Sequence, residues 1–265
     1  MSTADTNTET QDAAKVDQAV AAILAGTTAE AEALLLSVIA NTPAEYSNTA
    51  EEPDGTLKIT FWDQNEFIHY VMWQKQKGTE RKIRWVKNAY PRAYFYLGFI
   101  CVKTKQYKQA LEYLEQGQAL EPTNPKFSFE KAQALVHSGE KEQALALYQA
   151  VHEVGPHVSA RDLAIAHRGR GFALIELNRL DEAEAAFKSS LEIEPNSSIA
   201  MGELQYIARL RKGGRALPGK AVQTQPQNIW KCLVCGISLT KGTIVTVNDV
   251  PHFVCEKCRP TLPKT

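Results

Sequence analysis

A mainly helical fold, followed by a small metal-binding module, is predicted by this sequence of 265 residues. The first supporting observation is a helical pattern that recurs in the middle of the chain with a period of 34 residues. The second is a pair of Cys-x2-Cys motifs near the C-terminal end, and the third is a β-prone stretch before the repeats. Repeated helical units stack on one another and share a continuous core. The expected architecture is therefore a solenoid of helix pairs with a small α+β insert and a C-terminal β-hairpin.

The N-terminal part is predicted to be disordered over residues 1–11 and to form a helical hairpin over residues 12–45. The first 54 residues carry ten acidic side chains and one basic one, which is typical of a solvated end. Ala31 precedes Pro43 by twelve residues, a spacing that recurs in the repeats downstream. A small residue at a helix contact and a proline after the helix favour two closely packed helices.

Residues 46–90 are predicted to form an insert made of a strand, a helix and a second strand. The segments LKITFW (57–62) and KIRWV (82–86) are rich in β-branched and aromatic residues, which favour strands. Between them, Asp63 fits the start of a helix and Gly78 fits its end. The alternative interpretation is a plain hairpin that runs through FIHYVMW.

Three later segments share one pattern. They are QYKQALEYLEQGQALEP (106–122), EKEQALALYQAVHEVGP (140–156) and RLDEAEAAFKSSLEIEP (179–195). In each segment an alanine is followed twelve residues later by a proline. Twelve residues before that alanine lies a small residue, which is Gly98, Ala132 or Gly171. The first two copies are 34 residues apart and the third follows after 39, which indicates a five-residue insertion around HVSARDL.

This pattern resembles the tetratricopeptide repeat over residues 91–197. The resemblance implies three helix pairs, at 91–124, 125–158 and 164–197, that stack into a right-handed superhelix, with a capping helix that ends at 212. Residues 12–45 are then a degenerate, similar hairpin. The family places a small residue at repeat position 27, where this chain has Gly117, Val151 and Ser190. The second repeat is therefore expected to pack less tightly than the other two.

In this family the first helix of each pair lines a concave groove that binds peptides. The side chains that the resemblance implies for this groove are Arg92, Phe95, Phe99, Lys103, Lys126, Phe129, Gln133, His137, Arg168 and Phe172. Aromatic and basic groups together suit a peptide with apolar anchors and some negative charge. For each aromatic residue the alternative is simple packing between helices. Chaperone-tail clamps of the family carry Lys and Asn where this chain has Phe95 and Phe99, which argues against a chaperone C-terminal carboxylate as ligand.

Four of the five cysteines form a C-x2-C-x19-C-x2-C arrangement, made by Cys232, Cys235, Cys255 and Cys258. Two such turns let four thiolates converge on one ion, and four cysteine ligands leave no open position for catalysis. A structural Zn²⁺ is expected, with rubredoxin-like iron as the alternative, whereas a redox pair would need a βαβ context that is missing here. The module at 230–265 resembles a zinc ribbon and follows a linker at 213–229. The fifth cysteine, Cys101, falls at an apolar core position of the repeat.

Charge and composition narrow the function. The formal net charge is zero and the pI is about 7, which gives no overall case for nucleic-acid binding. No secretory signal and no stretch of 18 apolar residues are found, so a cytoplasmic protein without a membrane span is expected. With no catalytic constellation and no small-molecule substrate in view, we expect a non-enzymatic adaptor that binds a partner protein through its repeats and uses the zinc module as a second contact surface. The alternative is a nucleic-acid-associated regulator, because residues 204–248 carry seven basic side chains and no acidic one.

Overall fold

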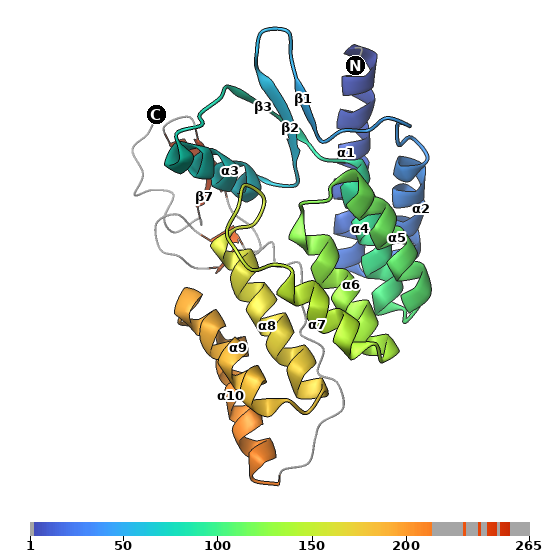
Figure 1. The fold of residues 1–265 in the computed structure, drawn as a ribbon. Helices are drawn as coiled ribbons and strands as arrows, with labels where there is room; N and C mark the ends of the chain where they lie inside the picture. The colour runs from blue at the N-terminus through green and yellow to red at the C-terminus, as the bar shows by residue number, and fades with distance from the viewer. Residues whose placement is uncertain (1–2, 214–229, 232–237, 240–242, 248–249, 255–265) are drawn as a thin grey trace. The chain divides into compact units, whose positions relative to one another are not determined.

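The computed structural model describes residues 3–213, 230–231, 238–239, 243–247 and 250–254. The chain divides into two compact units, Met1–Val222 and Gln223–Thr265. In its described part, the first unit contains ten α-helices and a three-stranded sheet (Figure 1). The expectation of a mainly helical fold is therefore confirmed.

The chain begins with two packed helices, α1 (Thr3–Ala25) and α2 (Thr28–Ile39). Their shared core contains the fully buried residues Val16, Ala19, Ala31, Leu35 and Val38. These residues recur every three or four positions, so each helix buries one face against the other. The structure thus has a helix pair where the sequence predicts a helical hairpin.

The predicted disorder of residues 1–11 needs correction, because α1 begins at Thr3. Buried polar contacts explain the earlier start. The Glu9 carboxylate accepts a hydrogen bond from Tyr46 Oη at 3.2 Å and forms an ion pair with Lys58 at 3.5 Å. Both partners belong to the segment that follows α2, so local sequence near Glu9 gives no sign of them.

The insert consists of β1 (Thr49–Glu51), β2 (Leu57–Phe61), α3 (Gln64–Lys77) and β3 (Ile83–Lys87). The strand order is β1-β2-β3, with β1 antiparallel and β3 parallel to β2. α3 is therefore the crossover between two parallel strands, which is the strand, helix and strand arrangement predicted for this region and not the plain hairpin. β1 was not predicted, because its three residues carry no strand pattern of their own.

Seven helices follow the insert. They are α4 (Tyr90–Lys103), α5 (Tyr107–Leu120), α6 (Pro125–Ser138), α7 (Lys141–Gln149), α8 (Ala160–Glu176), α9 (Leu180–Ile193) and α10 (Ser198–Arg211). Consecutive helices pack on one another, as a solenoid of helix pairs requires (Figure 1). A Cβ at Gly98 would lie 2.5 Å from Leu114 Cγ, and one at Gly171 would lie 2.6 Å from the Phe187 ring. The small residues of the repeat are thus the contacts between paired helices.

The second repeat departs from the other two. α5 and α9 end two residues before Pro122 and Pro195, whereas α7 ends at Gln149, well before Pro156. The repeat pattern predicts that α7 runs up to Pro156, and this prediction is wrong. The residue at repeat position 27 is buried in the first and third repeats but is a larger, half-buried valine here, Val151. We attribute the early end of α7 to this valine, which cannot enter the close contact that glycine or serine makes.

The chain after α7 forms a loop and then starts α8 early. Ser159 and Asp162 form a capping box, so α8 begins at Ala160, four residues before the predicted repeat boundary. The loop packs against the insert: His69 Nε2 of α3 lies 2.7 Å from the Gly155 carbonyl oxygen, and the rings of Tyr70 and His157 are 5.5 Å apart.

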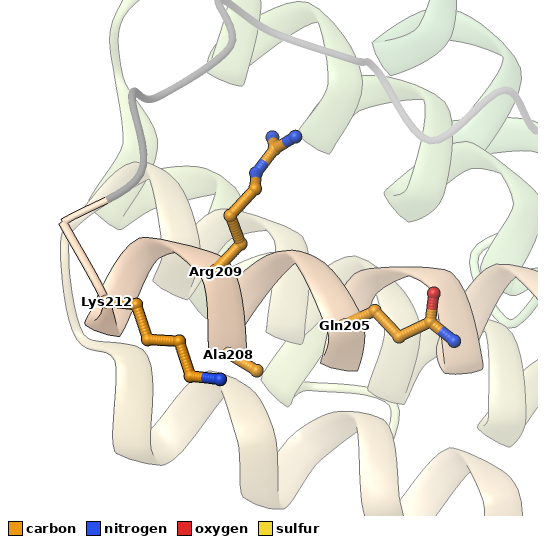
Figure 2. Close-up of a pocket in the computed structure, with 4 residues that line it drawn as sticks. All are labelled: Gln205, Ala208, Arg209 and Lys212. Carbon is orange, nitrogen blue, oxygen red and sulfur yellow. The ribbon is translucent and has the colours of Figure 1, made fainter.

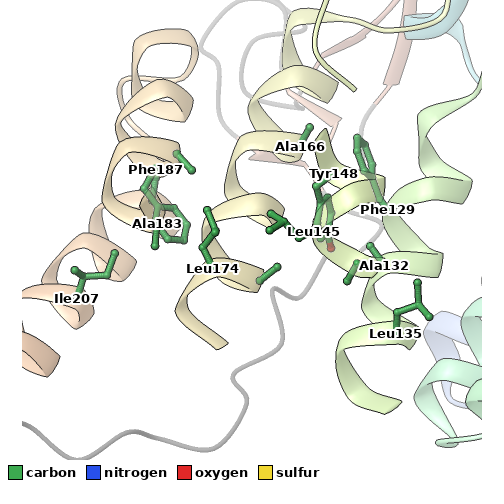
Figure 3. Packing of buried hydrophobic residues seen from close by; sticks show 14 residues of the cluster. Phe129, Ala132, Leu135, Leu145, Tyr148, Ala166, Leu174, Ala183, Phe187 and Ile207 are labelled. Atoms are coloured by element: carbon green, nitrogen blue, oxygen red, sulfur yellow. The ribbon is translucent and has the colours of Figure 1, made fainter. Parts of the chain in front are cut away.

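One buried apolar cluster joins α6 to α10 (Figure 3). Leu174 and Phe187 in this cluster are fully buried. The ring of Tyr148 lies so close to α8 that a Cβ at Gly169 would be 2.1 Å from it. Glycine at this position therefore allows α7 and α8 to approach each other.

The second unit is described only for four short strands. β6 (Thr243–Val247) pairs antiparallel with β7 (Val250–Val254), and β4 (Trp230–Lys231) pairs antiparallel with β5 (Ser238–Leu239). The four cysteine positions lie outside the described residues, as does most of the predicted linker. The zinc ribbon therefore stays a prediction.

Candidate functional site

The ten side chains implied for a peptide groove lie in three environments. Arg92, Phe129, Arg168 and Phe172 are buried. Phe95 and Lys126 are half-buried against the insert. Phe99, Lys103, Gln133 and His137 are half-buried or exposed, and we call these four the open positions. We call Arg92, Phe95 and Lys126 the filled positions, because other parts of the chain occupy the space beside them.

The two predicted groove residues Phe129 and Phe172 are buried. The ring of Phe129 stacks on Tyr148 of α7 with the centroids 6.1 Å apart. Phe172 is 7% exposed and lies in α8. For these two residues the structure favours the alternative left open by the sequence, in which the aromatic ring belongs to the core.

The two buried arginines connect helices through ion pairs. Arg92 donates to the Asp17 carboxylate at 2.7 Å and to the Asn88 carbonyl oxygen at 3.0 Å. Burial raises the pKa of Asp17, but its hydrogen bonds from Lys87 and Arg92 outweigh this and leave the pKa below its ordinary value. Arg168 likewise donates to Ser190 Oγ at 3.0 Å. A guanidinium committed to such bonds is not free to bind a ligand.

The insert places Trp62 against the first turns of α4 and α6. Trp62 is 6% exposed, and its ring lies 5.0 Å from that of Phe95 and 5.8 Å from that of Phe127, both edge to face. The indole Nε1 donates to Glu121 Oε2 at 2.7 Å. This single side chain therefore covers one of the predicted groove aromatics and fastens the insert to the first repeat.

Glu66 of α3 neutralises the predicted groove cation Lys126. The two side chains form an ion pair, and the Lys126 ammonium lies 5.0 Å from the centroid of the Trp62 ring. Burial alone would lower the pKa of Lys126, but the charges of Glu66 and Asp162 raise it above its ordinary value. Burial also raises the pKa of Glu66, which Lys126 opposes. Because its charge is neutralised by Glu66, Lys126 is not available to bind an acidic group of a peptide.

A buried carboxyl group completes this contact. Glu121 is 3% exposed and accepts hydrogen bonds from Trp62 Nε1 and from Asn88 Nδ2, the latter at 3.2 Å. Burial and the negative charge of Glu66 raise the pKa of Glu121 to about 7. Hydrogen bonds of this kind offset the cost of burying the carboxyl group.

The open positions lie on the later turns of α4 and α6. The Lys103 ammonium is 5.3 Å from the centroid of the Phe99 ring, and Lys103 is exposed. The exposed His137 ring stacks on Tyr107 with the centroids 5.6 Å apart and the planes 12° apart. These groups offer aromatic surface and positive charge at corresponding positions of neighbouring repeats.

A hollow of about 440 Å³ lies on the outer surface of α10 (Figure 2). It is lined by Gln205, Ala208, Arg209 and Lys212. The Arg209 guanidinium lies 5.0 Å from the centroid of the Tyr206 ring, and neither Arg209 nor Lys212 has a carboxylate partner within the described residues. Within the described residues, this face of the capping helix is therefore exposed and basic.

Metal and membrane features are limited in the part of the chain that is described. No group of three or more His, Cys, Asp or Glu side chains there could hold a metal ion. Cys101 is buried, and burial raises the pKa of its thiol to about 11, which confirms the core role expected for it. None of the described helices combines the length and apolar character that crossing a membrane requires.

Sequence reasoning did not assign Trp62, Glu66 and Glu121 to the site. Their partners are 59 or 60 residues away along the chain, so no local spacing indicates these contacts. The usable signal was chemical: Trp62 ends a β-prone run and Glu66 lies four positions later in the first turn of a helix, so this corner of the insert offers both an aromatic ring and a carboxylate.

Tetratricopeptide repeat models match residues 102–166 and 164–197. Residues 102–197 therefore carry tetratricopeptide repeats. Among solved structures, the chain is similar to the first such domain of human RPAP3, at 24% identity over 46% of this chain and 93% of that one, with a TM-score of 0.42. It is also similar to the Sgt2 domain of Aspergillus fumigatus (21%, 52% and 91%, TM-score 0.41) and to MamA of AMB-1 (20%, 77% and 83%, TM-score 0.43). No curated protein sequence matches the chain.

Proposed function

We propose that this chain is a non-catalytic scaffold that binds a segment of a partner protein at the open positions. The carrying observation is that the repeats leave Phe99, Lys103 and His137 accessible at corresponding places of α4 and α6. Aromatic surface next to positive charge suits a segment with an apolar anchor beside acidic residues. The ligand site is shorter than the repeat family implies, because the filled positions are taken by the chain itself.

Site-specific photo-crosslinking in the cell of origin tests this proposal. A photoreactive residue replaces Lys103 in the intact chain, and a matched chain carries it at Lys108, an exposed residue of α5. We expect a defined set of adducts from position 103 that is absent from position 108. The adducts should fall by about tenfold in a Phe99→Ala, His137→Ala background, because those changes remove the aromatic surface.

Two results would overturn it. One is identical adducts from both crosslinker positions, which would indicate unspecific contact. The other is undiminished adducts in the double variant with helical content unchanged by circular dichroism, which would show that the open positions do not bind.

The C-terminal module is proposed to hold one structural Zn²⁺ through Cys232, Cys235, Cys255 and Cys258, and to serve as a second contact surface. The support is the spacing of the four cysteines, since four thiolates are a closed donor set for zinc. Elemental analysis of the intact chain should find about one equivalent of metal, and a Cys232→Ser, Cys255→Ser variant should lose it. Iron in place of zinc would show itself by visible absorption, and less than half an equivalent of any metal would contradict the proposal.

Nucleic-acid association is the second candidate function. It is favoured by Arg209 and Lys212 at the hollow on α10, which form no ion pair within the described residues, and by the basic residues that follow in the sequence. Binding of this type weakens steeply with salt because counterions are released from the phosphates. Retention on heparin and on labelled RNA or DNA, measured in rising salt, decides it: no retention at low salt removes this candidate.

A further inference from the structure

Within the part of the chain that the structure describes, β3 is an edge strand whose outer side is unpaired. Asn88 N donates to the Phe61 carbonyl oxygen at 2.9 Å, which together with the register fixes the side of β3 that faces β2. The backbone N–H and C=O groups of Ile83, Trp85 and Lys87 consequently point away from β2. No other strand among the described residues pairs with β3. Three alternate residues of β3 thus offer backbone N–H donors and C=O acceptors to an added strand.

Lys87, the charged residue on the outer side of β3, is bound to α1 by an ion pair. An outward lysine is a common device for keeping other strands off an open edge. Here the Lys87 ammonium is held by the Asp17 carboxylate of α1 at 2.5 Å. The residue at the centre of the outer row is Trp85, which presents apolar surface instead of charge.

Apolar side chains flank the same edge. Trp85 is 36% exposed, and its ring stacks on Phe67 of α3 with the centroids 5.4 Å apart. Val71, one helical turn after Phe67, is 39% exposed, and Met72 is 57% exposed. A strand added to β3 would place alternate side chains beside Trp85, where they could be buried.

The charge around the edge selects the occupant. Lys75 and Lys77 lie exposed in the last turn of α3, and neither forms an ion pair within the described residues. A second copy of the chain would bring the same lysines close to each other, so like charges disfavour self-pairing. An acidic segment would be attracted instead.

We propose that the outer edge of β3 docks an extended, acidic segment of a partner protein, which adds to the sheet as a fourth strand. Backbone hydrogen bonds to Ile83, Trp85 and Lys87 supply the pairing, and Trp85 and Val71 accept an apolar side chain. This surface is separate from the open positions, so it stands or falls independently of the proposed function.

The test is a selection of phage-displayed random decapeptides on the intact chain, followed by synthesis of the enriched peptides. We expect acidic sequences with alternating β-prone residues and no proline. Their binding should shift the backbone amide resonances of Ile83, Trp85 and Lys87 in ¹⁵N-labelled chain and slow the exchange of these amides. N-methylation of the peptide at alternate positions should weaken binding by about tenfold or more in one phase of the alternation and hardly at all in the other, because only every second amide pairs with β3.

A charge-reversal pair provides the matched control. Lys75→Glu with Lys77→Glu should weaken binding by about tenfold, whereas Lys105→Glu with Lys108→Glu, on exposed residues elsewhere, should leave it unchanged. The proposal is overturned if no enriched peptide perturbs the three amides, if N-methylation shows no alternation, or if both charge pairs have the same effect.

Discussion

The first turns of α4 and α6 differ from their last turns in what covers their inner side chains. At the filled positions, Phe95 and Lys126 meet Trp62 and Glu66 of the insert. At the open positions, Lys103 rests over its own neighbour Phe99 and meets nothing from the insert among the described residues. Positions that the repeat pattern assigns to one groove thus serve internal packing towards the N-terminal end of each helix and remain accessible towards its C-terminal end.

This difference indicates how the insert would limit the length of the proposed ligand site. An aromatic residue and a carboxylate from the chain itself sit on Phe95 and Lys126, the kind of groups that the groove was expected to take from a partner. The filled positions should therefore control stability and the open positions should control binding.

The largest expected effect is that of Trp62→Ala. The substitution empties the space between Phe95 and Phe127 and leaves Glu121 without its indole donor, so we expect a loss of about 3–5 kcal/mol of unfolding free energy. Urea unfolding followed by circular dichroism measures it. Phe99→Ala is the control at the open positions, and an equally large loss there would contradict the division.

Lys126→Met and Lys103→Met form a matched pair of charge removals. The first leaves the half-buried Glu66 without its cation and should cost about 2 kcal/mol. The second removes an exposed ammonium and should change stability by less than about 0.5 kcal/mol. Chemical unfolding at neutral pH compares them. A smaller loss for Lys126→Met than for Lys103→Met would show that Glu66 does not depend on this ion pair.

Glu130 lies on α6 between the filled Lys126 and the open Gln133, and its removal should stabilise the protein. It is 3% exposed, and burial raises its pKa from 4.5 to about 8. Between these two values the folded protein keeps a proton that the unfolded chain releases, so this group lowers stability as pH rises from about 4.5 to about 8.

Glu130→Gln should therefore raise the free energy of unfolding at pH 7 by about 1–2 kcal/mol and have little effect at pH 4. Thermal unfolding of both chains across this pH range tests the sign. A variant that is less stable at pH 7 would mean that the carboxylate has a charged partner in the folded state.

The order of helices was accessible to sequence reasoning because packing of small residues repeats along the chain. Gly98 and Gly171 contact Leu114 and Phe187 as their positions in the repeat predict. The end of α7 at Gln149 was not accessible: Val151 marks the second repeat as different but does not say where its helix stops, and the contact of the following loop with His69 is made by a distant part of the chain. The spacing of small residues predicts how neighbouring helices pack. It does not predict contacts with the insert that precedes the repeats.

The same limit explains the outcome for the candidate site. The repeat pattern implies which helix faces would line a groove, but it does not show that Phe129 packs on the ring of Tyr148 or that Phe172 is buried. The filled positions depend on Trp62, whose side chain meets them only after the insert has folded. Contacts between residues so far apart in the chain produce no regular pattern that the sequence could reveal.

His137→Ala at the open positions should also have only a small effect on stability. The His137 ring is exposed and stacks only on Tyr107, so its loss should cost about 0.5 kcal/mol, the lower range for an aromatic pair. Crosslinking from position 103 should nevertheless fall severalfold, because the stacked rings form part of the accessible aromatic surface. Unchanged adducts together with a large loss of stability would contradict this prediction, because they would show that His137 contributes to stability and not to binding. Unfolding and crosslinking measured on the same preparation separate these outcomes.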